Sequence, residues 1–211
     1  MIRLSKNAFN TPIINISKPL GVLQFKNGDE GTVEGLVEGT LPMNGVGVAT
    51  GQFAEVKRTF PQSSIEAFTS LTGDSNPIHS SSSKIVPGIL LCSTFPSLLS
   101  CILPDCVYRS QTLKFASPVF AGQEVLVRID VNNVKALRVA RKNLDTQTQG
   151  DEAVARENVL VLKFETSVLR VKDGICVLAG VGEAVVKGGL GLAELVEERG
   201  GGGEDGEDDV R

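Results

Sequence analysis

The chain has no tryptophan, one tyrosine and one histidine among its 211 residues. Its four cysteines form no Cys-x-x-Cys pair, and a single histidine supplies a zinc site poorly, so we expect no metal centre. No apolar run approaches the roughly 20 residues that span a bilayer, which argues against membrane insertion. The formal charge of −4 provides no basic surface for nucleic acid. The length and apolar content predict one cored domain with tails.

Both ends of the chain differ in composition from its middle. Residues 1–20 contain three basic residues and no acid, a composition typical of a mitochondrial presequence, although a disordered start explains it equally well. Residues 27–51 are rich in glycine and lack periodicity, so residues 1–51 are predicted to be a targeting or flexible segment. Residues 189–211 end in glycine and acids, and we expect a polar tail there.

The middle of the chain, residues 52–188, is predicted to be the folded domain. Apolar residues alternate along Val125–Val131, the pattern of a half-buried strand. Lys172–Asp173–Gly174 is a hairpin turn signal between two β-rich runs. Residues 138–157 are polar, and they are interpreted as an extended hairpin tip or a disordered insertion. The predicted strands are residues 52–60, 125–131, 158–171 and 175–187.

A first helix is predicted before residue 73. Ser63 and Glu66 have the spacing of a capping box, and apolar residues recur at helical intervals up to Leu71. Gly73 is well placed to end this helix, because glycine readily adopts the left-handed conformation of a C-terminal cap. The residues that follow are therefore held at a helix C-terminus.

The turn after this helix contains the only histidine. Asp74 and His79 are five residues apart, separated by a tight turn through Asn76 and Pro77. A carboxylate and an imidazole on one rigid turn can share a water or a hydroxyl and move protons in both directions. The alternative is structural: Asp74 could cap backbone amides, and a lone histidine is often a packing residue. The spacing alone leaves both interpretations open.

A second helix is predicted over Gly88–Leu103, which is apolar nearly all round, as a helix surrounded by sheet would be. Pro96 lies inside it, removes one backbone hydrogen bond and should kink or re-pack the helix. Its N-terminal amides, beside the bare Gly88, could stabilise an oxyanion, or Gly88 could merely permit close packing. Ser93 could face the same site or bond to its own helix backbone.

Gly73–His79 reads G-D-x-N-P-[aliphatic]-H, which resembles the signature of the MaoC-like, R-specific enoyl-thioester hydratases (hydratase type 2). The similarity extends over most of residues 52–187 and is greatest to the mitochondrial 3-hydroxyacyl-thioester dehydratase branch. The further segments that carry it are Pro87–Phe95, Tyr108–Phe115, Pro118–Gly122 and Gly182–Val186.

This resemblance implies an α+β hot-dog fold, in which an antiparallel sheet wraps around a central helix. It implies reversible dehydration of (R)-3-hydroxyacyl thioesters of coenzyme A or acyl carrier protein, without metal or cofactor, in a homodimer serving mitochondrial fatty-acid synthesis. Asp74 and His79 would then be the proton-handling pair, and Asn76 would orient the loop or the water. The Gly88 amide would hold the thioester carbonyl, and Ser93 would correspond to a serine near the site.

The segment after the histidine departs from the family pattern. Only Ser80–Ile85 separates His79 from Val86, whereas family members carry a longer segment that helps to roof the site. The shortening makes a second function possible, that of a catalytically weakened hot-dog protein that binds acyl thioesters.

Overall fold

The computed structural model describes residues 18–26, 32–42, 45–80, 84–141 and 155–187, so the first 17 residues and the expected tail at 189–211 lie outside the described residues. The strands are β1 (Lys18–Lys26), β2 (Thr32–Gly39), β3 (Phe53–Thr59), β4 (Val107–Phe115), β5 (Glu124–Arg141), β6 (Ala155–Arg170) and β7 (Cys176–Lys187). The helices are α1 (Gln62–Thr72), α2 (Pro77–Ser80), α3 (Gly88–Cys92) and α4 (Thr94–Ile102).

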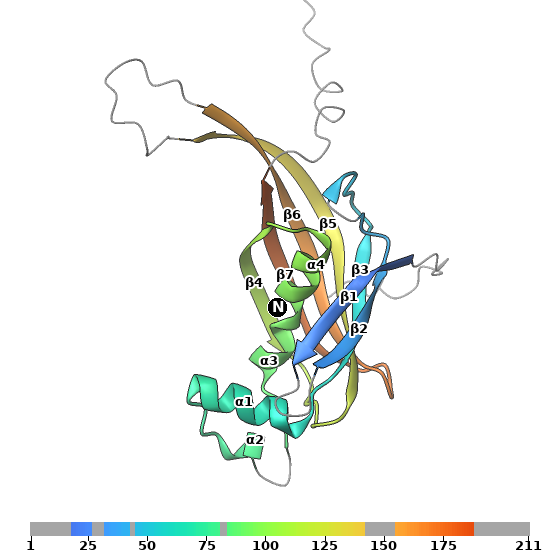
Figure 1. Ribbon diagram of the computed structural model, residues 1–211, viewed down its shortest axis with the longest axis vertical. Coiled ribbons are helices and arrows are strands. Elements are labelled where there is room, and N and C mark those ends of the chain that lie inside the picture. The colour runs from blue at the N-terminus through green and yellow to red at the C-terminus, as the bar shows by residue number, and fades with distance from the viewer. Residues whose placement is uncertain (1–17, 27–31, 43–44, 81–83, 142–154, 188–211) are drawn as a thin grey trace, which may run out of the picture.

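The seven strands form one antiparallel sheet in the order β1-β2-β3-β5-β6-β7-β4. Helix α4 packs against one face of this sheet, and α1 and α2 lie together beyond one end of it (Figure 1). The sheet curls so that α4 contacts β1, β3 and β5. An antiparallel sheet around a central helix is the architecture that the sequence predicted.

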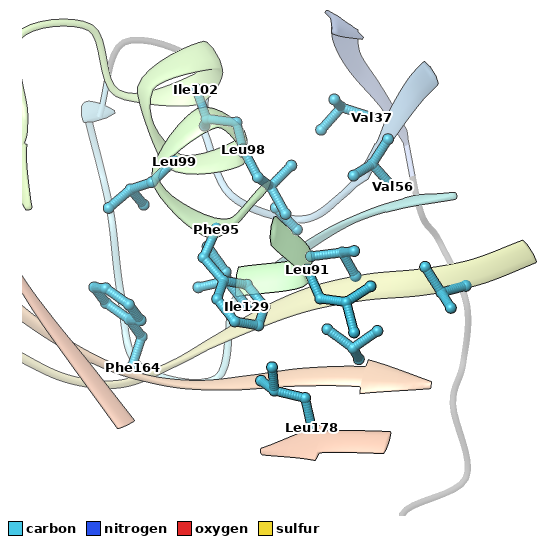
Figure 2. Close-up of a cluster of buried hydrophobic side chains, with 14 of the residues drawn as sticks. Val37, Val56, Leu91, Phe95, Leu98, Leu99, Ile102, Ile129, Phe164 and Leu178 are labelled. Carbon is cyan, nitrogen blue, oxygen red and sulfur yellow. The ribbon is translucent and has the colours of Figure 1, made fainter. Parts of the chain in front are cut away.

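The core lies between α4 and the inner face of the sheet (Figure 2). Val125, Val127 and Ile129 are completely buried on β5, which confirms the alternation predicted for this strand. On the helix, Phe95 and Leu98 are also completely buried. Each such side chain contributes about 1.5–3 kcal/mol relative to an exposed one, so this layer supplies much of the stability.

The prediction of a targeting or flexible segment over residues 1–51 is wrong where β1 and β2 form. Strand β2 pairs with β1 and β3, and Val37 and Leu41 are almost completely buried. Gly35, one of the glycines that suggested flexibility, is needed for close packing: a Cβ on it would lie 2.8 Å from the side chains of Phe25 and Val56. Glycine here removes bulk between packed strands and does not loosen the chain.

The two ends of the polar segment at residues 138–157 pair with each other as the arms of a hairpin. Arg138–Arg141 pairs with Ala155–Asn158 across β5 and β6, which agrees with an extended hairpin and contradicts disorder at these positions. The central part, residues 142–154, lies outside the described residues. The predicted turn before β7 is confirmed, since Gly174 has φ 68° and donates its N–H to the Arg170 carbonyl at 2.8 Å.

The first helix ends as predicted but begins differently. Gly73 has φ 71° and donates its backbone N–H to the Thr69 carbonyl, a left-handed C-terminal cap. The N-cap is Pro61, so Ser63 lies inside the first turn and the capping-box prediction is wrong. Leu71 is 86% exposed, so the apolar stripe on this helix is shorter than its spacing suggested.

The predicted central helix is divided into α3 and α4. The division falls at Ser93, three residues before the proline that was expected to kink the helix. Pro96 instead occupies the first turn of α4, where a backbone N–H has no intrahelical acceptor and its absence costs little. Starting a new helix next to the proline therefore avoids a broken bond in mid-helix.

Candidate active site

The turn between α1 and α2 is fixed by two side chains that accept bonds from the backbone. Asp74 Oδ1 accepts the Asn76 N–H at 3.0 Å, and Asn76 Oδ1 accepts the Ile78 N–H at 3.3 Å at the start of α2. These are local Asx-type bonds, in which a short polar side chain replaces a backbone acceptor. Asp74 therefore does cap a backbone amide, as the structural interpretation predicted, but this bond uses only one of its two carboxylate oxygens.

His79 follows on α2 and is 9% exposed. Its Nδ1 lies 2.7 Å from the carbonyl oxygen of Ile85. A carbonyl oxygen can only accept a hydrogen bond, so Nδ1 carries the hydrogen. In the neutral ring this leaves the lone pair on Nε2, and the backbone of Ile85 thereby selects the nitrogen that can take up a proton.

This free nitrogen points at the second oxygen of the carboxylate. His79 Nε2 lies 3.5 Å from Asp74 Oδ2, and the Asp74 side chain remains 34% exposed. The separation is too long for a good direct hydrogen bond, and a neutral Nε2 and an ionised carboxylate are both acceptors. A water or substrate hydroxyl between them would satisfy both. The two groups therefore converge on one position for a proton donor.

A pocket of about 460 Å³ opens beside the imidazole: His79 and Gly88 both line it, whereas Asp74 is not among its lining residues. Its walls are mostly aliphatic or aromatic, and no Asp, Glu, Lys or Arg is among the residues that line it. The main apolar contributors are Ile85, Val86, Leu91, Phe115, Val119 and Val177. Such a slot suits an uncharged, apolar group held next to one polar reactive point.

A second hollow, of about 540 Å³, lies between β2 and β3 and is lined by Arg58 and Glu55, among others. Neither Asp74 nor His79 borders it. Although it is the larger of the two, its position away from the imidazole makes it a poor candidate for the proton chemistry.

The packing role predicted for Gly88 is confirmed, and its oxyanion role stays a prediction. A Cβ at this position would lie 2.3 Å from a ring carbon of Phe115, so the packing requirement is real. Its N–H also belongs to the first turn of α3, where no intrahelical acceptor is available. Gly88 also lines the pocket.

Ser93 is not brought to this site. Its Oγ donates to the Leu90 carbonyl at 2.7 Å, the backbone bond that was the alternative for this residue, and it does not line the pocket. The structure thus brings Asp74 and His79 together and places His79 and Gly88 on one pocket, with Asn76 fixing the turn. The Ile85 carbonyl could not be found from sequence, because any residue type provides the same backbone oxygen.

The remaining reactive side chains give no competing centre in the part of the chain that the structure describes. No three His, Cys, Asp or Glu residues there come together as metal ligands. Cys92, Cys101, Cys106 and Cys176 are free thiols, and burial raises the pKa of each, which disfavours the nucleophilic thiolate. None of the helices in the described segments is long and apolar enough to span a membrane.

Known proteins resemble this chain in sequence and in fold. The chain is 27% identical over 128 residues to a mitochondrial 3-hydroxyacyl-[acyl-carrier-protein] dehydratase of Solanum lycopersicum, a match that covers 56% of this chain and 75% of that protein. It is 33% identical over 104 residues to the (R)-specific enoyl-CoA hydratase of Aeromonas caviae, covering 44% and 78% of the two chains.

The fold has a counterpart among solved structures. The (R)-hydratase from A. caviae involved in PHA biosynthesis superimposes with a TM-score of 0.50 at 23% identity, over 66% of this chain and 98% of that one. This likeness confirms the hot-dog fold. The family described as "MaoC like domain" matches residues 47–154, more than half of the chain. Together with the 33% identical relative, of which the chain covers 78%, this match shows that the chain belongs to the MaoC-like domain family.

Proposed function

We propose that this protein interconverts (R)-3-hydroxyacyl thioesters and trans-2-enoyl thioesters by removal and addition of water. The observation that carries the proposal is the Nε2 of His79, left free by the Ile85 carbonyl and 3.5 Å from Asp74 Oδ2 at an apolar pocket. The names of the relatives, a dehydratase and a hydratase of acyl thioesters, support the same reaction.

Dehydration needs one proton removed and one delivered. A member of the Asp74–His79 pair takes the C2 proton, and the electron pair moves onto the thioester carbonyl oxygen. The C3–O bond then breaks as the hydroxyl receives a proton from the pair and leaves as water, while the electrons form the C2=C3 bond. Hydration reverses these steps. The pair thus takes up one proton and gives one back, so its proton count is unchanged after each turnover.

The negative charge on the thioester oxygen requires a donor. The Gly88 N–H at the pocket wall is the candidate, because its helical position leaves it without an intrahelical partner. A preorganised donor of this kind contributes about 3 kcal/mol to transition-state stabilisation. Asn76 contributes by holding the turn, since its side chain is bonded to the Ile78 amide.

We further propose that the protein is a homodimer. Strand β4 ends the sheet, and its outer edge has no neighbouring strand among the described residues. Val107 and Phe115 at its two ends are each 52% exposed, and Ile89 on α3 is 56% exposed. An apolar, unpaired strand edge invites pairing with another chain. Pairing of two β4 edges would cover Phe115, a wall of the pocket, and light scattering during gel filtration would measure the resulting mass.

The carrier and location are narrower proposals. The apolar pocket accounts for the acyl end of a thioester, and either coenzyme A or acyl carrier protein could present it. We place the enzyme in mitochondria, in fatty-acid synthesis, on the basis of the basic composition of residues 1–20 and the mitochondrial relative. Import into isolated mitochondria followed by N-terminal sequencing would test the location.

The direct test is the addition of purified protein to crotonyl-CoA, with loss of the enoyl absorbance and the chirality of the product as readouts. We expect hydration to the R alcohol, and an S product or a rate unchanged in His79→Ala would contradict the proposal.

The short Ser80–Ile85 segment favours a second candidate, an acyl-thioester binder. Saturable binding of crotonyl-CoA without turnover would support that function instead.

A further inference from the structure

Arg170, the last residue of β6, makes contacts on two sides. Its side chain is 14% exposed. Its Nε donates to both carboxylate oxygens of Asp173 at 3.0 and 2.9 Å, and its Nη2 lies 2.9 Å from Asp173 Oδ2. Its Nη1 donates to the carbonyl of Pro118, 52 residues away, at 3.1 Å. The first contact belongs to the β6–β7 turn, whereas the second reaches a residue that lines the pocket.

The segment that contains Pro118 is bonded to the segment that orients the imidazole. The Val119 carbonyl accepts the Val86 N–H at 2.8 Å, and the Lys84 carbonyl accepts the Ala121 N–H at 2.9 Å. These two bonds frame Ile85, whose carbonyl binds His79 Nδ1 and whose own N–H donates to the Ile78 carbonyl on α2 at 3.1 Å. The two segments pair only through an isolated antiparallel bridge between Ile85 and Phe120. Because this pairing is so short, their alignment depends on neighbouring contacts.

The backbone at Lys84 is itself unfavourable. Its φ of 42° is in the left-handed region, which costs a residue with a Cβ of the order of 1 kcal/mol and persists only where surrounding contacts hold it. The bonds to residues 119 and 121 are such contacts. A shift of the 116–121 loop would therefore release this conformation and move the Ile85 carbonyl.

We propose that Arg170 is a positioning residue for His79, acting through the Pro118–Val119 wall and the Ile85 carbonyl. Without the bond to Ile85, the neutral ring loses the partner that holds hydrogen on Nδ1. The tautomer with hydrogen on Nε2 would then be populated, and its Nε2 could not accept a proton. Asp173 supports the same function by fixing the guanidinium, since a bidentate carboxylate restricts the orientation of the arginine fork.

The test uses the fact that the chain contains one histidine, so its ring nitrogens are assigned without ambiguity. Histidine labelled with ¹⁵N would be observed by NMR in the full chain and in Arg170→Met and Arg170→Lys. Arg128→Met is the matched control, because the Arg128 guanidinium on β5 is also held by carboxylates, those of Glu55 and Asp130, but makes none of its described bonds to a residue that lines the pocket.

We expect one tautomer, hydrogen on Nδ1, in the wild type and in Arg128→Met, and a mixture in Arg170→Met. Arg170→Lys should recover most of the Nδ1 form, because an ammonium can still donate to the Pro118 carbonyl. In turnover of crotonyl-CoA, Arg170→Met should lose kcat on the order of 10-fold with little change in KM, as misplacement of a catalytic group predicts.

A merely structural Arg170 would lower the melting temperature and leave the tautomer unchanged, and that result would overturn the proposal. If Arg170→Met does not fold, Arg170→Gln, which also removes the guanidinium but keeps a polar side chain, provides the same readout, and an unchanged tautomer there is equally decisive. The kcat expectation rests on the proposed function, but the NMR signal does not. If the wild-type protein shows no turnover, the proposed enzymatic function is contradicted, but the NMR measurement still tests whether Arg170 positions His79.

Discussion

The turn that carries Asp74 and His79 and the core around α4 are held in place by different forces. The turn is largely exposed, and side-chain bonds from Asp74 and Asn76 to backbone amides fix its shape. Helix α4 is fixed by apolar burial, with Phe95, Leu98 and Leu99 inaccessible to solvent. Polar bonds impose directions on side chains, whereas apolar contacts supply most of the free energy of folding. Reactivity and stability should therefore be separable by mutation.

Asp74→Asn is expected to give the largest effect. The amide oxygen can still accept the Asn76 N–H, so the turn keeps its shape, but the side chain no longer handles protons. We expect turnover of crotonyl-CoA to fall by about 10²–10⁴-fold, the range for a lost acid/base group, with a melting temperature close to wild type. A variant that retains wild-type kcat would remove the carboxylate from the mechanism.

Leu98→Ala should have the opposite profile. The side chain is completely buried between α4 and the sheet, and its truncation leaves a cavity in addition to the lost burial. We expect the free energy of unfolding to fall by about 2–5 kcal/mol in urea titrations. At a temperature where the variant remains folded, kcat per folded molecule should match wild type, and a strong loss there would show that the two regions are coupled.

Gly88→Ala should affect both stability and turnover, because Gly88 packs against Phe115 and also lines the pocket. The new Cβ would overlap the Phe115 ring, and overpacking of this kind costs about 1–3 kcal/mol. The double variant Gly88→Ala, Phe115→Leu removes the obstacle and separates the two roles of Gly88. If the glycine only permits packing, the double variant should recover both stability and turnover. If the amide must also approach the thioester closely, stability should recover while kcat stays low.

The sequence predicted the strands of the core and the pair at the site because their signals are local. Alternating apolar residues identify β5, and the spacing of Asp74 and His79 on a turn brings their side chains together. The linker prediction failed because the packing of Gly35 against Phe25 and Val56 depends on tertiary neighbours.

The site's other components could not be predicted for the same reason. The bond from His79 to the Ile85 carbonyl depends on how the chain returns past α2, and a backbone oxygen has no residue type to mark it. The pocket walls come from strands far apart in sequence, such as β4 and β7. Local patterns identify reactive side chains, whereas the groups that orient them emerge only from the fold.

Asn76→Ala should give the smallest effect and the sharpest check on how the turn is held. Its side chain accepts only the Ile78 N–H in the contacts described for it, a cap whose loss costs about 1 kcal/mol. If Asn76 serves as this cap, Asn76→Asp should keep stability because a carboxylate accepts the same bond. If Asn76 also orients the reacting water, its NH₂ group matters, and Asn76→Asp should lose kcat at unchanged stability. Urea titration and crotonyl-CoA turnover on the two variants therefore distinguish a residue that shapes the turn from one that takes part in the chemistry.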